Sequence, residues 1–327
     1  MTVGERGEHA LIEWLCRRLP RPGPDVIVGI GDDAAVVRSP RGALLVQTTD
    51  TLVDGVHVDT RLMAPHDVGR RAVAVNLSDL AAMGARPEWL LLSLVLPPSL
   101  PLATFGALVE GVADEAGRWN ARVIGGNITQ SPGPLVVDVA ATGSVRPRRL
   151  LRRDTGRAGD ELWLTGTVGG AAAGLAALRS GGPATEAALD AAARYLTPTP
   201  RLREAWAVAR ERAVRAAIDL SDGLADGVRQ LATASGTGAR LDATALPLHP
   251  ALAELCDDPV ATGLASDDYE LLLAVPPGAA RRLTANRLRV ATPFTRIGVL
   301  TAVPDLVLVR PSGDEPLPAG FEHFAQV

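Results

Sequence analysis

Residues 74–87 read Ala74-Val75-Asn76-Leu77-Ser78-Asp79-Leu80-Ala81-Ala82-Met83-Gly84-Ala85-Arg86-Pro87. The pattern predicts a helix that starts at Pro65 and runs to Gly84, a typical C-terminal cap. Asn76 and Asp79 lie three residues apart and therefore share one face of this helix. Because their neighbours are apolar, that face has to point at solvent or at a polar cleft. The stretch therefore predicts a helix that brings polar side chains to a functional site.

Four further acidic clusters interrupt or end apolar runs. They are Gly31-Asp32-Asp33, Thr48-Thr49-Asp50-Thr51, Asp219-Leu220-Ser221-Asp222-Gly223 and Ser266-Asp267-Asp268-Tyr269-Glu270. A carboxylate in an apolar setting is costly unless a positive group meets it. Hydroxyl and carboxylate oxygens suit Mg²⁺, which keeps several waters and binds few carboxylates together with substrate phosphate. The clusters therefore indicate metal ions and a polyphosphate ligand.

Each cluster also has a purely structural interpretation. The segment 31–33 fits an Asp-rich turn that bonds its own backbone. The segments 48–51, at the end of a strand expected over 43–49, and 219–223, at a strand-to-helix turn, both fit helix N-caps. His57, which follows the second cluster, is more typical as a hydrogen-bonding residue than as a metal ligand. These alternatives stay open for each cluster taken alone.

A glycine-rich turn, Gly166-Thr167-Val168-Gly169-Gly170, precedes a helix of small residues. Backbone N–H groups at such a turn could approach a phosphate. Tight packing of a strand against a helix explains the glycines equally well.

All 33 residues in the Lys+Arg count are arginine. A Walker-type phosphate loop and Schiff-base chemistry on lysine are therefore excluded. A polyanionic ligand has to be neutralised by arginine, metal ions or backbone N–H groups. The sequence also shows no Cys–His pair or Ser-centred elbow, so it favours direct phosphoryl transfer, in which positioning and charge neutralisation dominate.

A chain of 327 residues is long enough for two domains. Helical and strand patterns alternate in both halves, which predicts an α/β or α+β fold. The arginine-rich segment 146–157 reads as the connection, giving expected domains at 1–147 and 148–327. A net charge of −4 disfavours a nucleic-acid partner. The N-terminal segment has no apolar signal core and the longest apolar run, 89–96, is short, which predicts a cytoplasmic protein without a membrane partner.

The motifs in combination resemble the thiamine-monophosphate kinase family, within the superfamily of aminoimidazole ribonucleotide synthetase and selenophosphate synthetase. They are Gly29-Ile30-Gly31-Asp32-Asp33, residues 49–57, residues 74–87 and Ile218-Asp219-Leu220-Ser221-Asp222-Gly223-Leu224. The resemblance runs essentially end to end. It implies a two-domain aminoimidazole ribonucleotide synthetase-like fold, with N-terminal sheets that pair across a homodimer. It also implies that the N-terminal domain binds ATP and magnesium and that a C-terminal α/β domain closes the cleft.

The activity implied by the resemblance is ATP-dependent phosphorylation of thiamine monophosphate to thiamine diphosphate. The residues it assigns to several Mg²⁺ ions are Asp33, Thr48, Thr49, Asp50, Asp79, Asn127, Asp219 and Asp222. Those it assigns to ATP are Gly126, Asn127, Arg153 and Ser221. Those it assigns to the thiamine side are His57, Asp267 and Phe321. No side chain is expected to act as a covalent nucleophile.

Two positions depart from the family's pattern. The family usually has Gly-Gly-Asp where this chain has Gly125-Gly126-Asn127, and an amide lacks the charge of the carboxylate. It usually has Gly-Gly-Glu-Asp-Tyr-Glu where this chain has Ala265-Ser266-Asp267-Asp268-Tyr269-Glu270, which shortens an acid on the substrate side. Two alternatives therefore stay open: a paralogous kinase or synthetase for another small molecule, and a nucleotide-binding homologue with weakened catalysis.

Overall fold

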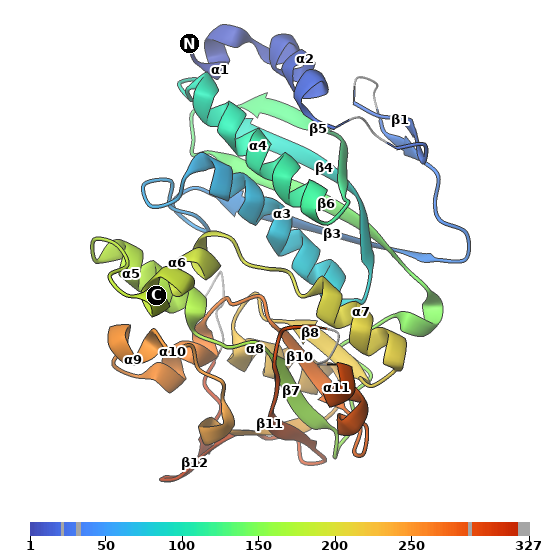
Figure 1. The fold of residues 1–327 in the computed structure, drawn as a ribbon, viewed down its shortest axis with the longest axis vertical. Helices are drawn as coiled ribbons and strands as arrows, with labels where there is room; N and C mark the ends of the chain where they lie inside the picture. Colours follow the sequence, from blue (N-terminus) through green and yellow to red (C-terminus); the bar gives the residue numbers. More distant parts are fainter. Residues whose placement is uncertain (21–22, 31–33, 287–289, 320–327) are drawn as a thin grey trace. The chain divides into compact units, whose positions relative to one another are not determined.

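The computed structural model describes residues 1–20, 23–30, 34–286 and 290–319. Contacts divide the chain into two compact units (Figure 1). Unit 1 comprises residues 1–80 and 85–147, and unit 2 comprises residues 81–84 and those from 148 onward. In the described part of the chain, no helix is long and apolar enough to cross a membrane.

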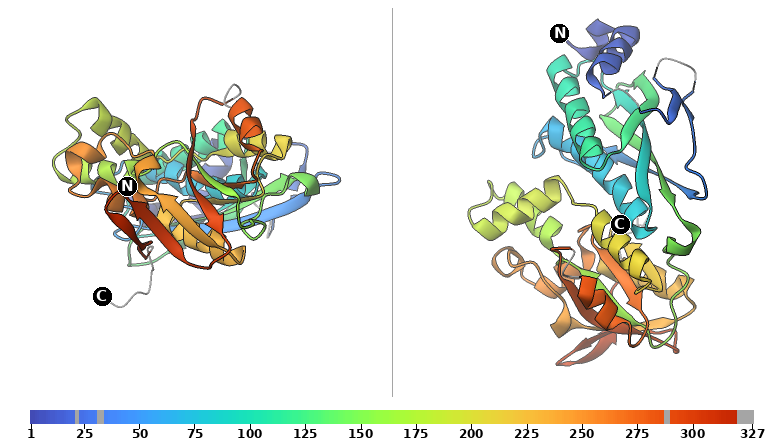
Figure 2. Two further views of the ribbon diagram at one scale, coloured as in Figure 1. Left: turned by 90° about the horizontal axis from the view of Figure 1, so that it is seen from below. Right: turned by 45° about the vertical axis from the view of Figure 1, so that its right-hand side comes forward.

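A four-stranded sheet with the strand order β3-β6-β4-β5 forms the centre of unit 1. Its strands are β3 (Leu44–Val53), β4 (Arg86–Leu96), β5 (Arg122–Gln130) and β6 (Val136–Val145). β4 and β5 are parallel, and the other neighbours are antiparallel. Helices α3 (Pro65–Ala82) and α4 (Leu102–Arg118) lie on one face of this sheet, as Figure 2 shows in its right-hand view. We call this the helix face and the opposite one the open face.

The N-terminal elements of unit 1 are α1 (Val3–Arg6), α2 (Glu8–Arg18) and the antiparallel strands β1 (Val26–Val28) and β2 (Val36–Val37). The helix predicted from the 74–87 stretch is confirmed as α3. It ends at Ala82, two residues before the predicted end at Gly84, whose φ of 69° is left-handed and therefore favours glycine. The N–H of Ala85 then returns to the carbonyl of Leu80 at 2.8 Å, which closes the helix end.

β3 and β5 of this sheet are longer than the sequence pattern suggested. β3 continues to Val53, so the segment 48–51 lies inside a strand and the N-cap interpretation of it is wrong. Threonine is β-branched and suits a strand, and every residue of β3 is paired with β6. β5 likewise continues past the expected 121–124 to Gln130, which places Asn127 inside the sheet. Regular side-chain alternation therefore governs where these polar residues point.

Unit 2 is built on a seven-stranded sheet with the order β13-β12-β9-β11-β7-β10-β8. The strands are β7 (Glu161–Thr165), β8 (Ala216–Asp219), β9 (Gly238–Asp242), β10 (Leu271–Val275), β11 (Phe294–Thr301), β12 (Leu306–Arg310) and β13 (Gly313–Pro316). The β12–β9 pair is parallel and the other neighbours are antiparallel. β10 is buried along its whole length, so both faces of the sheet are covered there.

The helices of unit 2 surround this sheet. They are α5 (Gly170–Arg179), α6 (Glu186–Leu196), α7 (Leu202–Glu211), α8 (Leu224–Ala234), α9 (Leu252–Leu255), α10 (Pro259–Ala265) and α11 (Ala280–Asn286), with 3₁₀ turns at Pro147–Arg149 and Ala243–Ala245. Leu224, Val228 and Leu231 of α8 join Leu272 and Ala274 of β10 in the main core. This packing fixes the strand-to-helix turn between β8 and α8, where one predicted cluster lies.

Candidate functional site

The helix face of unit 1 brings together two residues predicted from separate motifs. The hydroxyl of Thr48 on β3 donates a hydrogen bond to Oδ2 of Asp79 on α3 at 2.5 Å. Asp50 lies two residues further along β3, so its side chain points to the same face as Thr48. The predicted ligands Thr48, Asp50 and Asp79 therefore share one face of the sheet.

Asn76 lies one turn before Asp79 but is not exposed to a cleft. It is fully buried, and its Nδ2 donates to the carbonyl of Ala72 at 2.9 Å. Its Oδ1 has no hydrogen-bond partner among the described residues. The prediction that the shared face points at solvent or a polar cleft is wrong for Asn76, because the helix rotates it into the packed interior.

The open face of the same sheet carries a second group that includes an acid missed in the sequence. Thr49 and Thr51 alternate with Thr48 and therefore point away from the helices. Their hydroxyls donate to Oδ1 of Asp138 on β6, at 3.2 and 2.7 Å respectively. Thr49 also lies 3.2 Å from the carbonyl of Val139.

Asn127 belongs to the same polar row as Asp138. The strand register pairs Thr51 with Asp138, Asp138 with Ser93, and Ser93 with Asn127. Directly paired residues point to the same face of a sheet. The row therefore crosses all four strands on the open face, and Asn127 is exposed at its β5 end.

His57 lies in the turn after β3. Its Nδ1 accepts a hydrogen bond from the backbone N–H of Val53 at 3.1 Å. This contact fits the hydrogen-bonding interpretation of His57.

In unit 2, two of the predicted clusters lie side by side. β8 pairs with β10 so that Asp219 is opposite Leu271. The N–H of Leu220 donates to the carbonyl of Glu270 at 2.9 Å, and the N–H of Tyr269 donates to the carbonyl of Leu220 at 3.0 Å. These bonds bring the segments 219–223 and 266–270 together, so the predicted residues Asp219, Ser221, Asp222 and Asp267 gather at one end of the sheet.

The N-cap interpretation of the 219–223 cluster is wrong. α8 begins at Leu224 with Gly223 as its N-cap residue, and no side-chain hydrogen bond caps it there. Asp219 is buried, whereas Ser221 and Asp222 are half-buried. Asp219 and Asp222 therefore do not cap α8.

Arg153 comes close to the same helix from the connecting segment. Its side chain is exposed, and Nη1 donates to Oε1 of Gln230 on α8. Its carbonyl accepts from the hydroxyl of Ser235 at 2.9 Å. These contacts hold the main chain of Arg153 while its guanidinium stays at the surface.

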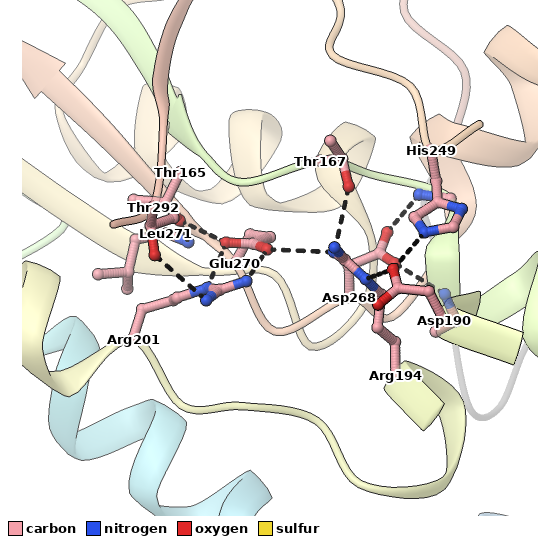
Figure 3. A network of polar contacts seen from close by, with 12 residues as sticks. Thr165, Thr167, Asp190, Arg194, Arg201, His249, Asp268, Glu270, Leu271 and Thr292 are labelled. Atoms are coloured by element: carbon pink, nitrogen blue, oxygen red, sulfur yellow. Dashed lines mark hydrogen bonds and ion pairs between the residues drawn. The ribbon is translucent and has the colours of Figure 1, made fainter. Parts of the chain in front are cut away.

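The 266–270 segment contributes Glu270 to a buried ionic network (Figure 3). Glu270 is fully buried, and Nε and Nη2 of Arg201 each donate to one of its carboxylate oxygens. The hydroxyl of Thr165 donates to Oε2 of Glu270 at 2.6 Å, and Arg194 lies 3.8 Å from Oε1. Burial lowers the pKa of Arg201, but the charge and hydrogen bond of Glu270, together with the charges of Glu204 and Asp268, raise that pKa overall. This acid is thus neutralised by the protein's own arginines.

The glycine-rich turn before α5 binds Asp268, another acid of the 266–270 segment. Asp268 accepts hydrogen bonds from the N–H groups of Gly169 and Ala171 at 2.5 and 2.9 Å. Gly166 has a φ of 58°, and a Cβ there would lie 2.1 Å from the Glu270 carboxylate. A larger residue at Gly166 would therefore clash with Glu270, and the N–H groups of Gly169 and Ala171 bind Asp268 rather than a phosphate in this structure.

The environment of Asp268 raises its pKa. Burial raises the pKa of Asp268 to about 6, although the N–H groups of Ala171 and Gly169 oppose that effect. The neighbouring Asp267 charge adds to the increase. The residue keeps some exposed surface, but its carboxylate oxygens are turned into the α5 turn.

Comparison with known proteins identifies the family. The model of the AIR synthase related protein, N-terminal domain, matches residues 31–145, and that of its C-terminal domain matches residues 157–310. The thiamine-monophosphate kinase of Salmonella typhimurium (strain LT2) is 38% identical over 331 residues, which is 98% of each chain. The chain belongs to the thiamine-monophosphate kinase family.

Solved structures agree with this membership. The crystal structure of thiamine-monophosphate kinase from Stenotrophomonas maltophilia K279a matches with a TM-score of 0.81 and 35% identity, covering 91% of this chain and 94% of that one. AaThiL complexed with AMPPCP and TMP matches with a TM-score of 0.77 and 31% identity over 99% of both chains. The predicted family and the two-domain aminoimidazole ribonucleotide synthetase-like fold are confirmed.

The donor chemistry of both units fits the magnesium expected of a thiamine-monophosphate kinase. The gathered side chains are carboxylates, hydroxyls and an amide, which are the oxygen donors that Mg²⁺ prefers. Among the described residues, no three His, Cys, Asp or Glu side chains converge on one point. Mg²⁺ is commonly held by one or two carboxylates together with waters and substrate phosphates, so this arrangement is compatible with it.

Two family positions, Asp33 and Phe321, lie outside the described residues. Asp138, by contrast, is a site candidate that the sequence interpretation missed. It stands between Val137 and Val139, so alternation alone places it opposite to two core residues. That signal was available in the sequence. The contact of Asp138 with Thr49 and Thr51 depends, however, on a strand register that pairs residues 89 and 87 positions apart in sequence.

Proposed function

We propose that the protein transfers the γ-phosphoryl group of ATP directly to thiamine monophosphate, giving thiamine diphosphate and ADP. The observation that supports this most strongly is the match, over 99% of both chains, to AaThiL complexed with AMPPCP and TMP. The curated thiamine-monophosphate kinases of Salmonella typhimurium and Escherichia coli also match over 98% of this chain. The absence of lysine is compatible with such a reaction when metal ions and arginine neutralise the phosphates.

Magnesium would be held by the oxygen donors that the family motifs supply. The residues we assign to it are Asp33, Thr48, Thr49, Asp50, Asp79, Asn127, Asp219 and Asp222. When bound, Mg²⁺ neutralises charge on the phosphoryl oxygens and orients the two reacting groups in line. The contact between Thr48 and Asp79, from motifs 31 residues apart, supports the assignment.

The ligand-facing residues follow from the family motifs. We assign Gly126, Asn127, Arg153 and Ser221 to ATP. We assign His57, Asp267 and Phe321 to the thiamine side. The exposed guanidinium of Arg153 and the half-buried positions of Ser221 and Asp267 support roles in binding a ligand.

We also propose a homodimer in which the sheets of unit 1 pair. Leu45 and Leu91, on the open face, are 46% and 43% exposed, and apolar surface of this kind favours association. In such an assembly, the predicted domain 1–147 would bind ATP and magnesium. The predicted domain 148–327 would close the cleft. A cytoplasmic location, with no nucleic-acid or membrane partner, stays a prediction of the sequence.

The test of substrate is ADP release from ATP with a panel of acceptors. We expect thiamine monophosphate to stimulate release far above thiamine and above a control without acceptor. Stimulation by another phosphorylated or carboxylated molecule, but not by thiamine monophosphate, would establish the paralogue instead. Calorimetric ATP binding without ADP release, restored by Asn127→Asp, would establish a weakened homologue.

The metal assignment predicts the behaviour of two variants. Asp50→Ala and Asp79→Ala should each reduce turnover at least about 1,000-fold, because several kcal/mol of charge stabilisation is lost. Circular dichroism and gel filtration should show the wild-type fold and assembly. Asp114→Ala, which removes an acid that is 69% exposed on α4, is the matched control and should keep wild-type turnover. Wild-type rates in Asp50→Ala or Asp79→Ala would refute the assignment.

A further inference from the structure

We propose that Ser266 and Asp268 are positioning residues for the phosphoryl acceptor, because they anchor to α5 the short turn that carries Asp267. The inference rests on the proposed function, in which Asp267 lies on the thiamine side. Neither Ser266 nor Asp268 is among the residues assigned to a ligand. Both would act through Asp267, by holding it in the orientation that binds the acceptor.

Residues 266–268 form a γ-turn with Asp267 at its centre. The N–H of Asp268 donates to the carbonyl of Ser266 at 3.0 Å, which is the hydrogen bond between residues i and i+2 that defines this turn. Asp267 is not among the described residues with a positive φ, so the turn is of the common inverse type. The side chain of the central residue projects outward from such a turn. The turn therefore presents the Asp267 carboxylate away from its own backbone.

Both side chains that flank this central residue bind the N-terminus of α5. The carboxylate of Asp268 accepts hydrogen bonds from the N–H groups of Gly169 and Ala171. The hydroxyl of Ser266, which is buried, accepts one from the N–H of Ala172 at 3.1 Å. N–H groups in the first turn of a helix have no partner within that helix, so these side chains satisfy them. One anchor before the central residue and one after it therefore fix the turn.

A second set of hydrogen bonds connects the turn to the end of β8. The N–H of Tyr269 donates to the carbonyl of Leu220 at 3.0 Å, and the N–H of Leu220 donates to the carbonyl of Glu270 at 2.9 Å. Leu220 lies between Asp219 and Ser221, which we assign to magnesium and ATP. The main chain that follows the anchored turn is therefore paired directly with the main chain that carries these two assignments.

Two features next to Asp267 lower stability, which a turn with only a structural role does not require. Burial raises the pKa of Asp268 to about 6, so its ionised carboxylate is disfavoured in the folded protein at neutral pH. Tyr269 has a φ of 54°, in the left-handed region that a bulky side chain rarely adopts. Strained backbone and perturbed pKa values cluster at functional sites. Both features therefore favour a role in holding Asp267 over a role in stability alone.

Ser266 and Asp267 are also two positions at which this chain departs from the family's pattern, which usually has glycine and glutamate there. Glycine has no hydroxyl to offer to the N–H of Ala172. Aspartate is one methylene shorter than glutamate and has one torsion angle fewer, so its reach depends more closely on where its backbone lies. The additional anchor and the shorter acid therefore fit together.

The experiment measures ADP release by the full chain, with thiamine monophosphate and ATP varied in turn. Ser266→Ala and Asp268→Asn should each raise the KM for thiamine monophosphate roughly fivefold to tenfold. The value of kcat and the KM for ATP should change less than about twofold, because a misplaced Asp267 weakens ground-state and transition-state binding alike. A purely structural role would lower the melting temperature and leave the KM for thiamine monophosphate unchanged.

Thr185→Ala and Asp242→Asn are the matched controls. Each changes a side chain that accepts a hydrogen bond from a backbone N–H at the start of another helical segment of unit 2, at 3.1 and 2.9 Å respectively. Both should leave the two KM values as in the wild type, whatever their effect on the melting temperature.

A double-mutant cycle tests whether the anchors act through Asp267. In the Asp267→Ala background, Ser266→Ala should not lower kcat/KM for thiamine monophosphate further, because the residue that it positions has been removed. A further loss as large as in the wild-type background would overturn the positioning role.

The Ser266→Ala variant removes a single hydroxyl and decides the outcome if Asp268→Asn does not fold. An unchanged KM for thiamine monophosphate in folded Ser266→Ala would overturn the positioning role alone, since the wild type would still be active. Wild-type protein that releases no ADP in response to thiamine monophosphate would instead refute the proposed function and the role that rests on it. The two failures are therefore distinguishable.

Discussion

Two acids, Glu270 in unit 2 and Asp138 in unit 1, differ in what neutralises them. Glu270 is fully buried and makes two charge-assisted bonds with Arg201. Asp138 is half-buried and is held by two threonine hydroxyls, without an ion-pair partner in the described chain. Both acids interrupt apolar sequence, but only the first is provided with a cation by the fold. An acidic residue within apolar sequence is therefore not by itself a sign of a ligand site.

Breaking the Glu270 pair should produce the largest stability loss. Glu270→Gln keeps the shape but leaves the guanidinium of Arg201, only 16% exposed, without its counter-charge. We expect a loss of about 3–5 kcal/mol, because removing one partner of a buried pair strands the other. Thermal unfolding should show a fall of roughly 10 °C.

The double variant Glu270→Gln with Arg201→Gln sharpens this result. It removes both charges together, so it should regain a substantial part of the stability that Glu270→Gln loses. A double variant as unstable as the sum of the two single variants would show that the charges do not interact.

Asp268 should give an intermediate, pH-dependent effect. Burial raises the pKa of Asp268 to about 6, so its ionised form is penalised in the folded protein. The stability associated with this group is present below its unfolded pKa and is lost as the pH rises through about 6. Asp268→Asn does not titrate, so its melting temperature relative to wild type should rise by a few degrees from pH 5 to pH 7.5. A difference that is constant over this range would contradict the assignment.

The smallest effect is expected at an exposed pair of the same unit. Nη2 of Arg240 lies 2.6 Å from Oδ2 of Asp314, and the two side chains are 44% and 50% exposed. Arg240→Gln should change the free energy of unfolding by less than about 1 kcal/mol, because solvent screens the pair. A loss comparable to that of Glu270→Gln in urea unfolding would remove the contrast between buried and exposed pairs.

The sequence predicted elements with strong periodicity and clear end signals. The helix that carries Asp79 is present, because its pattern is long and local. The extents of β3 and β5 were underestimated, since polar threonines and Asn127 interrupt the apolar runs while still fitting a pleated sheet. Strand length there is set by pairing with neighbours, which is not a local property.

The sequence predicted the motifs of the candidate site but not every contact that their residues make. The contact between Thr48 and Asp79 agrees with their shared assignment. The contact of Asp138 with Thr49, and the capture of the α5 turn by Asp268, depend on tertiary pairing across 89 and 99 residues. Neither has a sequence signal, because a single acid in a strand or loop does not reveal its partner.

The most direct test of the proposed activity is the identity of the product. Wild-type protein incubated with ATP, Mg²⁺ and thiamine monophosphate should form thiamine diphosphate in equal amount to ADP, as measured by chromatography. The Asp79→Ala variant serves as the blank. ADP without thiamine diphosphate, or neither product from folded, magnesium-saturated protein, would contradict the account.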